Sequence, residues 1–380
     1  MVLSMRSQDN SLLQIRTQHR LGKLALAFAC VALAVPSPLW AVLFNGTGDP
    51  AHNTTPPTGT LTNSGWQFQG QWGAFLGTPI SPKHFLAARH VGGAVGDTFV
   101  FRGVPYITTA VYDSPGSDLR LWRVCGVFPE FAPLYDGVSE IGQPCVIFGR
   151  GTQRGDPVVV STLLGPVTKG WRWGSYDGVQ RWGTNVIHMI SNGDLLEPSL
   201  APVGDVLLAT FDAGAGPDEV HLSIGDSSGG LFIPDAGVWK LAGINLGVEA
   251  FFNTNSTGPG FFAAISDKGG LYSGNEGNWQ QIPDLPTDLP TVLYATRVQS
   301  NLSWIRSVVD GPAPAEIRLQ SAPQVTGRFQ ETTNAMHDAG ARSFSVPLEG
   351  PRRFFRLDGC GSSRITNIVV FGTSVVIRYE

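Results

Sequence analysis

Glycine and proline interrupt the apolar segments of this chain every few residues. Its 380 residues include 47 Gly and 27 Pro, and long stretches with the three- and four-residue apolar spacing of a helix are scarce. Short apolar runs bounded by Gly, Pro, Asn and Asp are typical of strands and turns. The sequence therefore predicts a mostly β protein, and 42% hydrophobic residues are enough to fill more than one core.

Residues 1–41 have the pattern of an export signal. Four basic residues precede an apolar run at 24–35, a Pro-Ser-Pro break follows, and Leu-Trp-Ala at 39–41 suits a cleavage site. A membrane anchor is the alternative, but an apolar run of about twelve residues is too short for a bilayer, which needs ~20. We expect a secreted, periplasmic or cell-surface protein that starts at Val42 and keeps no membrane span.

The chain without this leader is acidic. The leader holds four of the 26 Lys and Arg and one of the 30 Asp and Glu, which leaves 22 basic against 29 acidic residues, a net charge of −7. No basic stripe interrupts this acidic balance. Nucleic acid is therefore not expected as a partner, because phosphate backbones attract basic surfaces.

Three cysteines remain after the leader, Cys125, Cys145 and Cys360. The first two end strand-like runs, and export permits a disulfide between them. Three buried, unpaired thiols are an equal alternative. The sequence leaves this choice open.

The strongest functional signal is the segment 225–232, Gly-Asp-Ser-Ser-Gly-Gly-Leu-Phe. It joins two strand-like runs at 203–211 and 231–246. A glycine-rich loop of this kind can lift one hydroxyl out of a sheet while backbone N–H groups converge on the atom that it attacks. Gly, Ser and Asp also cluster in ordinary surface turns, so the functional reading requires a base and an acid elsewhere in the chain.

Two earlier segments supply that base and that acid. His90 ends the run Ala-Ala-Arg-His, and histidine, with an ordinary pKa of ~6.5, can take and return a proton near neutrality. Asp118 enters the apolar run at 119–124, where a buried carboxylate needs a donor such as an imidazole N–H. Asp113 is the rival acid, but turn residues follow it and favour a solvated loop.

These segments resemble those of trypsin-like (chymotrypsin-fold) serine peptidases. The loop differs from the family's Gly-Asp-Ser-Gly-Gly-Pro-Leu-Phe at two positions, and the His and Asp segments resemble Thr-Ala-Ala-His and Asn-Asp-Ile-Ala-Leu-Leu. The order His90, Asp118, Ser227 matches this family and not subtilisins or α/β-hydrolases. The short interval of 28 residues between His90 and Asp118 is more like compact bacterial members.

The resemblance implies roles for these residues. His90 would be the general base, Asp118 the orienting acid and Ser227 the nucleophile, with the N–H groups of Gly225 and Ser227 holding the oxyanion. Ser228 stands where the family has Gly, which leaves the nucleophile register open between Ser227 and Ser228. An acyl-enzyme would form on a protein or peptide substrate, and no metal or cofactor is expected.

The resemblance also implies substrate-binding residues. The run at 238–247 resembles the family strand that pairs with the substrate backbone, so Asn245, Leu246 and Gly247 would border the substrate. His221, six residues before Ser227, would stand at the base of the specificity pocket and favour acidic or small side chains. A histidine in a plain turn is the alternative reading of His221.

The acid that precedes the nucleophile, Asp226, has a further implication. In the family it pairs with a freed chain N-terminus, and cleavage after residue 41 would supply the amine of Val42. Constitutive packing of the loops, without that pairing, is the alternative.

The family fold implies two six-stranded antiparallel β-barrels at 42–310. Within them we expect a surface lead-in at 42–65, one half-buried strand at 66–76 and an insertion at about 253–289 beside the active site.

A terminal helix around 298–309 would pack on the barrels, because its apolar residues recur at three and four. A linker at 311–315 and a small β-sandwich module at 316–380 would follow. A catalytically silent binding or adhesion protein and an esterase that uses the same triad are the functional alternatives. Oligomeric state and cleavage specificity are not given by the sequence.

Overall fold

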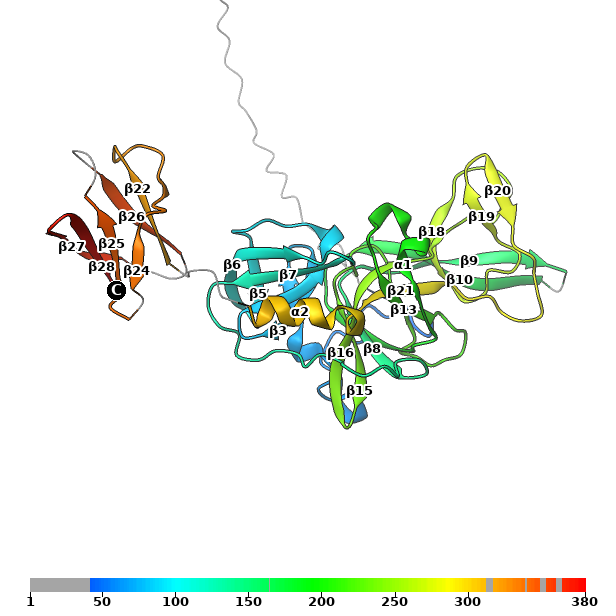
Figure 1. Ribbon diagram of the computed structural model, residues 1–380. Helices are drawn as coiled ribbons and strands as arrows, with labels where there is room; N and C mark the ends of the chain where they lie inside the picture. Colours follow the sequence, from blue (N-terminus) through cyan, green and yellow to red (C-terminus); the bar gives the residue numbers. More distant parts are fainter. Residues whose placement is uncertain (1–41, 164, 312–316, 339, 349–352, 360–363) are drawn as a thin grey trace, which may run out of the picture. The chain divides into compact units, whose positions relative to one another are not determined.

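The computed structural model describes residues 42–163, 165–311, 317–338, 340–348, 353–359 and 364–380 (Figure 1). The predicted signal at 1–41, Cys360 and most of the predicted linker lie outside the described residues. Strands dominate the described chain, which confirms the prediction of a mostly β protein. No helix in these ranges is long and apolar enough to cross a bilayer.

The first sheet is a closed six-stranded antiparallel barrel. Its core is aromatic: Phe85 and Phe99 stack with ring centroids 4.0 Å apart, and Trp72 packs on Trp122 at 4.8 Å. Around the barrel the strands follow the order β2-β3-β4-β7-β6-β5. They are β2 (Gly70–Trp72), β3 (Phe75–Ser81), β4 (His84–Ala88), β5 (Thr98–Phe101), β6 (Val104–Asp113) and β7 (Leu119–Val124).

The second large sheet has seven antiparallel strands in the order β11-β8-β15-β16-β21-β13-β12. The prediction of two six-stranded barrels is thus confirmed for the first barrel, and the second is not confirmed as a closed barrel. The strands are β8 (Pro144–Gly149), β11 (Arg181–Val186), β12 (Met189–Asn192), β13 (Asp205–Thr210), β15 (Gly230–Asp235), β16 (Val238–Val248) and β21 (Val292–Arg297).

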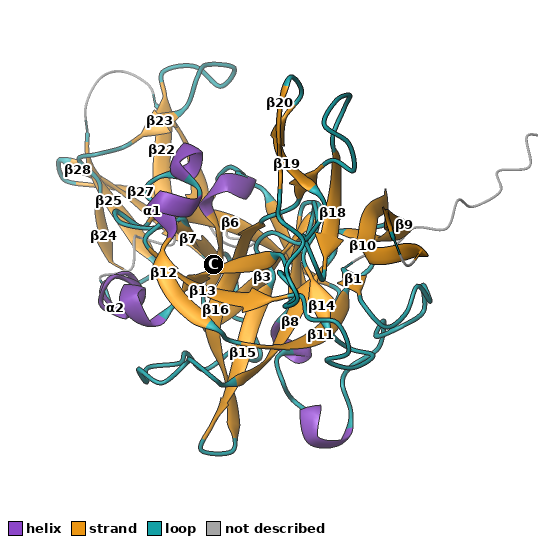
Figure 2. Cartoon of the chain, turned by 90° about the vertical axis from the view of Figure 1, so that its right-hand side faces the viewer, coloured by secondary structure: helices purple, strands orange, loops and turns teal. Residues whose placement is uncertain are grey.

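A four-stranded sheet lies beside it, in the order β17-β18-β10-β9 (Figure 2). The predicted insertion at about 253–289 contributes β18 and a separate hairpin, β19–β20. The strands of this region are β9 (Thr152–Thr162), β10 (Gly165–Tyr176), β17 (Phe251–Phe252), β18 (Phe261–Ile265), β19 (Tyr272–Asn275) and β20 (Asn278–Gln281).

The amino-terminal segment corrects two predictions. Residues 42–65 do not begin as a surface lead-in, because Val42 and Phe44 are buried and β1 (Leu43–Phe44) pairs with β14 (Val220–His221). The single strand predicted at 66–76 is instead a 3-10 turn followed by β2 and β3. Gly73, with φ of +57°, turns the chain between them.

The helices are short. α1 (Gly193–Leu196) lies in the loop before β13, and α2 (Leu302–Val309) is the predicted terminal helix, with Leu302 and Ile305 buried. The 3-10 helices are η1 (Gly59–Leu61), η2 (Trp66–Phe68), η3 (Arg89–Val91), η4 (Pro198–Leu200) and η5 (Gln299–Asn301).

One core joins the barrel to the seven-stranded sheet. Leu86 and Leu121 of the barrel share it with Phe148 and Phe232 of the sheet, and Ile305 of α2 packs against the same cluster. Burial of these large side chains fixes the seam between the two sheets, since interiors are packed at crystal-like density.

The carboxyl-terminal residues form two small sheets around one core, to which Leu319 contributes from one sheet and Phe344 and Ile377 from the other. The sheets have the orders β23-β22-β26 and β24-β25-β28-β27. Their strands are β22 (Ile317–Ala322), β23 (Gln330–Glu331), β24 (Met336–Asp338), β25 (Ser343–Pro347), β26 (Phe354–Gly359), β27 (Ile365–Phe371) and β28 (Ser374–Tyr379).

Cys125 and Cys145 are both free thiols. The disulfide that the sequence allowed between them is therefore absent, and the alternative of unpaired thiols holds for these two. Cys145 lies within β8, buried in the core of the seven-stranded sheet.

Candidate active site

Three predicted side chains meet at the seam between the barrel and the seven-stranded sheet. The Nε2 atom of His90 lies 2.9 Å from Oγ of Ser227, and its Nδ1 atom lies 2.5 Å from Oδ2 of Asp118. His90 is on η3 directly after β4, Asp118 precedes β7, and Ser227 is in the loop between β14 and β15. The hydroxyl, the imidazole and the carboxylate therefore form one hydrogen-bonded chain.

Backbone pairing of β4 with β7 brings the acid to the base. Ala88 is opposite Leu119 in this pairing, and the N–H of Arg89 donates to the carbonyl of Asp118 at 2.8 Å. The N–H of His90 donates to Oδ1 of Asp118 at 3.0 Å, so one carboxylate oxygen fixes the backbone and the other fixes the ring. Asp118 is 1% exposed, which keeps water from competing for these bonds.

The rival acid, Asp113, has a different partner. Its carboxylate accepts hydrogen bonds from Nε and Nη2 of Arg120 at 2.5 and 2.9 Å, and its side chain is 46% exposed. Asp113 is thus part of a surface ion pair, and Asp118 is the acid at His90.

The geometry selects one of the two serines. Ser228 has φ of +70° and is fully buried, and its Oγ accepts a hydrogen bond from the N–H of Ala88 at 3.0 Å. Its hydroxyl therefore holds the loop against β4, while that of Ser227 faces His90. The next residue must be glycine, because a Cβ on Gly229 would lie 1.9 Å from the carbonyl oxygen of Phe148.

Two backbone N–H groups of the loop have no acceptor among the described residues. In the described part of the chain, no residue accepts a hydrogen bond from the N–H of Gly225 or of Ser227. Gly225 has φ of +94°, a conformation that glycine adopts without strain. These are the two donors that the sequence predicted for an oxyanion.

The buried carboxylate of Asp226 anchors the same loop. It accepts hydrogen bonds from the N–H groups of Gly151 and Ser223 at 2.6 and 2.7 Å and from Oγ of Ser223 at 2.8 Å. Burial raises the pKa of Asp226 to about 7, although these bonds and the charge of Arg181 oppose the rise. A Cβ on Gly149 would touch both Asp226 and Val42, so the first residue after the predicted cleavage site lies beside this carboxylate.

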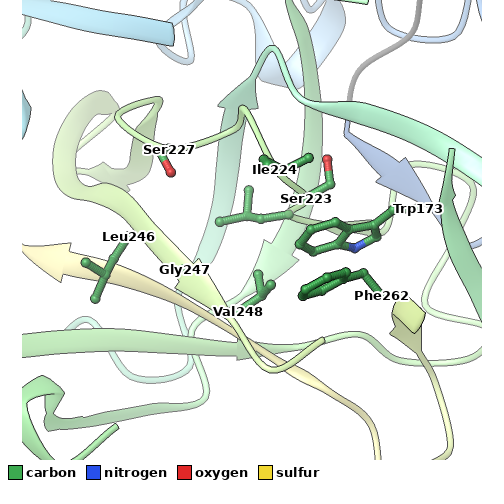
Figure 3. A pocket seen from close by; sticks show the side chains of 9 residues that line it. Trp173, Ser223, Ile224, Ser227, Leu246, Gly247, Val248 and Phe262 are labelled. Atoms are coloured by element: carbon green, nitrogen blue, oxygen red, sulfur yellow. The ribbon is translucent and has the colours of Figure 1, made fainter. Parts of the chain in front are cut away.

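Ser227 borders an apolar pocket of about 430 Å³ (Figure 3). The rings of Trp173 and Phe262 stack with centroids 4.8 Å apart, on the side of the pocket away from Ser227. Among the described residues, no charged side chain lines it. The lining residues are Trp173, Leu222, Ser223, Ile224, Ser227, Leu246, Gly247, Val248 and Phe262.

Two of the four predicted substrate-binding residues line this pocket, Leu246 and Gly247. Asn245 does not: it is fully buried, and its Nδ2 donates to the carbonyls of Phe148 and Asp226, so it supports the serine loop from behind. His221 does not line the pocket either.

The structure corrects the role predicted for His221. Its ring is fully buried, its Nδ1 atom is 2.8 Å from the carbonyl of Leu222, and pairing of β14 with β1 turns it against Phe211. Burial lowers the pKa of His221 to about 4, so the ring is neutral at pH 7. A neutral ring inside the core can neither contact nor attract an acidic substrate side chain.

Sequence reasoning missed the aromatic wall of Trp173 and Phe262. The only signal was the closely spaced pair Trp171 and Trp173 in β10, which by itself is equally typical of a core strand. For metals, the described residues contain no group of three His, Cys, Asp or Glu side chains with a binding arrangement.

Comparisons with known proteins add little to this geometry. No protein-family model matches the sequence, and no curated protein matches it. Among solved structures, the chain is similar to kallikrein-related peptidase 10, with 16% sequence identity and a TM-score of 0.37 over 68% of this chain and 100% of that one. At this level of similarity, the site rests on its own hydrogen bonds and packing.

Proposed function

We propose that this chain is a serine endopeptidase of the chymotrypsin-fold type, exported to the periplasm, the cell surface or the medium. The observation that carries the proposal is the hydrogen-bonded chain from Ser227 through His90 to Asp118, with distances of 2.9 and 2.5 Å. A nucleophile, a base and an orienting acid in this arrangement are the parts that acyl transfer needs.

The proposed reaction is acyl transfer through Ser227. Ser227 Oγ attacks the peptide carbonyl carbon while His90 Nε2 takes its proton, and the carbonyl oxygen becomes an oxyanion held by the N–H groups of Gly225 and Ser227. His90 then returns the proton to the leaving amine, and an acyl-enzyme remains. Water then attacks the acyl carbon while His90 Nε2 takes its proton. The bond from that carbon to Ser227 Oγ breaks, His90 returns the proton to this oxygen, and the carboxylic acid product leaves. Asp118 keeps the Nδ1 proton in place and stabilises the imidazolium in both steps.

The apolar pocket indicates the substrate residue that lies next to the scissile bond. With about 430 Å³ and no charged lining residue, the pocket suits a large apolar or aromatic side chain and would leave a buried charge unpaired. We expect cleavage of proteins or peptides after such residues. The acidic or small preference suggested by His221 is not part of this proposal.

The alternatives predict different chemistry. An esterase would use the same triad without needing an extended peptide, and a silent binding protein would need no competent hydroxyl. The aligned triad disfavours the silent protein, because nothing in binding alone requires three distant side chains to form one hydrogen-bonded chain.

The test is covalent labelling of the exported protein with a fluorophosphonate. We expect labelling of the wild type, none of Ser227→Ala or His90→Ala, and retained labelling of folded Ser228→Ala, which is the matched control. Digestion of casein and of a peptide library then separates a peptidase from an esterase. Absence of labelling in a folded, correctly processed wild type contradicts the proposal.

A further inference from the structure

One edge of β16 is free beside the nucleophile. Its pairing with β15 ends at Ile244, whereas on the other edge Gly247 and Val248 still pair with β21. Among the described strands, none pairs with the first edge beyond that point. An extended peptide can add to such an edge through main-chain hydrogen bonds.

The direction of that peptide follows from the sheet. The carbonyl of Asn245 accepts a hydrogen bond from the N–H of Ser228 at 2.9 Å, so β16 passes the serine loop at Asn245 and runs on from it towards Val248. Every pairing in this sheet is antiparallel. A peptide added in the same sense, with its reactive carbonyl at Ser227, has its residues N-terminal to the scissile bond beside Gly247.

The carboxylate of Glu197 lies over this position. Its Oε1 atom would be 3.7 Å from a Cβ on Gly247, and it is the only group of the described chain within 4 Å of that point, apart from the neighbours of Gly247 in sequence. The rest of the space in front of Gly247 is open. A peptide on the β16 edge therefore passes next to this carboxylate.

The loop that carries Glu197 is firmly held. Nη2 of Arg89, the residue before His90, donates to the carbonyls of Leu200 and Pro202 at 3.1 and 3.0 Å. Asp194 accepts a hydrogen bond from the N–H of Val203 at 2.6 Å. The residues on both sides of Glu197 are thus tied to neighbouring parts of the fold, one of which is the residue before His90.

Glu197 has no cation of its own. It is half-buried, and in the described ranges its carboxylate takes part in no hydrogen bond or ion pair. Burial raises its pKa, while the charge of His90 acts in the opposite direction. A half-buried carboxylate without a partner gains most from a charged hydrogen-bond donor.

We propose that Glu197 binds a cationic group of the substrate, N-terminal to the scissile bond, and that it determines specificity there. The group is either a Lys or Arg side chain or the free amine of a short peptide. Together, Glu197 and the apolar pocket favour a substrate that has a positive charge a few residues before a large apolar residue. The inference rests on the proposed peptidase function.

Matched peptides test it. The substrates are pairs of acetylated peptide nitroanilides with Leu directly before the scissile bond. In each pair the two peptides differ at one position, the second, third or fourth residue before that bond, where one has Lys and the other has norleucine. We expect Lys to raise kcat/KM about tenfold at one of these positions, the effect of one charged hydrogen bond. A second arm compares free with acetylated amino ends of short norleucine peptides, which separates the peptide amine from a side chain as the source of charge.

Variants assign the effect to one carboxylate. Glu197→Gln is expected to abolish the preference for the cationic substrate and to leave kcat/KM for acetylated norleucine peptides unchanged. Glu276→Gln, the same change at an exposed position in the β19–β20 turn, is expected to keep the preference. The preference is also expected to weaken with added salt.

Each contrary result leads to a different conclusion about Glu197 and the peptidase function. Equal cleavage of all matched pairs overturns the role of Glu197 and leaves the peptidase function standing. An equal loss for charged and neutral substrates in Glu197→Gln means that this residue only supports the loop, and it also overturns the inference. Absence of both labelling and cleavage in the folded wild type overturns the peptidase function together with this inference.

Discussion

The hydroxyl of Ser228 accepts a hydrogen bond from the N–H of Ala88 across the seam between the serine loop and the barrel strand β4, at 3.0 Å. This bond links the loop that carries Ser227 to the strand that leads into His90. The side chain of Ser228 therefore helps to hold the hydroxyl of Ser227 and the ring of His90 at a fixed separation. This arrangement requires Ser228 to adopt a φ of +70°, a backbone conformation that is strained for residues other than glycine.

A pair of substitutions at this position separates the bond from the backbone strain. Ser228→Ala removes the acceptor, keeps the strain and leaves a buried N–H unpaired, so we expect a loss of about 1–3 kcal/mol in the free energy of unfolding. Ser228→Gly also loses the bond but relieves the strain, and is expected to cost less. Urea unfolding measures both. A larger loss in the glycine variant would contradict this account of the loop.

Truncation of the aromatic wall should change specificity without removing the chemistry. Trp173→Ala takes away one of the two stacked rings at the far side of the pocket from Ser227. We expect kcat/KM for peptides with Phe before the scissile bond to fall about ten- to hundredfold, from lost apolar contact, and that for Ala peptides to change little. Fluorophosphonate labelling should persist.

Trp279→Ala is the matched control for that experiment. Trp279 packs on Phe251 in the same region of the fold but does not line the pocket. Equal effects of the two substitutions on Phe and Ala peptides would contradict the assignment of the pocket.

The meeting of His90, Asp118 and Ser227 could be predicted because each of the three residues lies in a short, contiguous motif. His90 and Asp118 are recognisable from the apolar runs beside them, and their order with Ser227 led to the class of site that we propose. The choice between Ser227 and Ser228 could not be made from sequence, since it depends on which hydroxyl meets the N–H of Ala88.

The pocket could not be predicted, because its wall is assembled by strand pairing. Trp173 and Phe262 come from β10 and β18, which are far apart in the chain and adjacent only in the folded sheet. His221 was misplaced for the same reason. Counting six residues back from Ser227 ignores the pairing with Leu43 that turns the ring into the core.

The burial of Val42 was missed because its neighbours in sequence are typical of a loop. Thr, Asn, Gly and Pro dominate the residues that follow, and only the pairing of β1 with β14 reveals that the first residues enter the core. Tertiary pairing here overrides local composition.

The two free thiols, Cys125 and Cys145, should form no stabilising disulfide, and Cys145 should react slowly with thiol reagents in the folded protein. Burial raises the pKa of the Cys145 thiol well above its usual range, which keeps it as the less reactive protonated form. We expect iodoacetamide to modify Cys145 only after unfolding, measured by mass spectrometry of peptides. Reducing agents should leave Tm unchanged; a fall in Tm would indicate a disulfide between Cys125 and Cys145.

Asp226 should make the free energy of unfolding depend on pH. The size and sign of this dependence should differ between a chain that begins at Val42 and one in which residues precede it. Its pKa in the folded protein is raised to about 7, above the ordinary value of 3.8 that applies after unfolding. Between these values the folded protein binds the proton more tightly, so stability present at low pH is lost as pH rises through 7, by up to ~4 kcal/mol. A free amine on Val42, which lies beside this carboxylate, would offset the loss.

We therefore expect two forms of the protein to differ. With residues of the predicted leader still attached to Val42, the free energy of unfolding should fall between about pH 4 and 7, and Asp226→Asn should reduce that fall. In the form that begins at Val42, the ammonium group should stabilise the charged carboxylate, and the fall should shrink or reverse. Identical pH profiles for the two forms would mean that the amine does not reach Asp226, and that packing alone holds the loop.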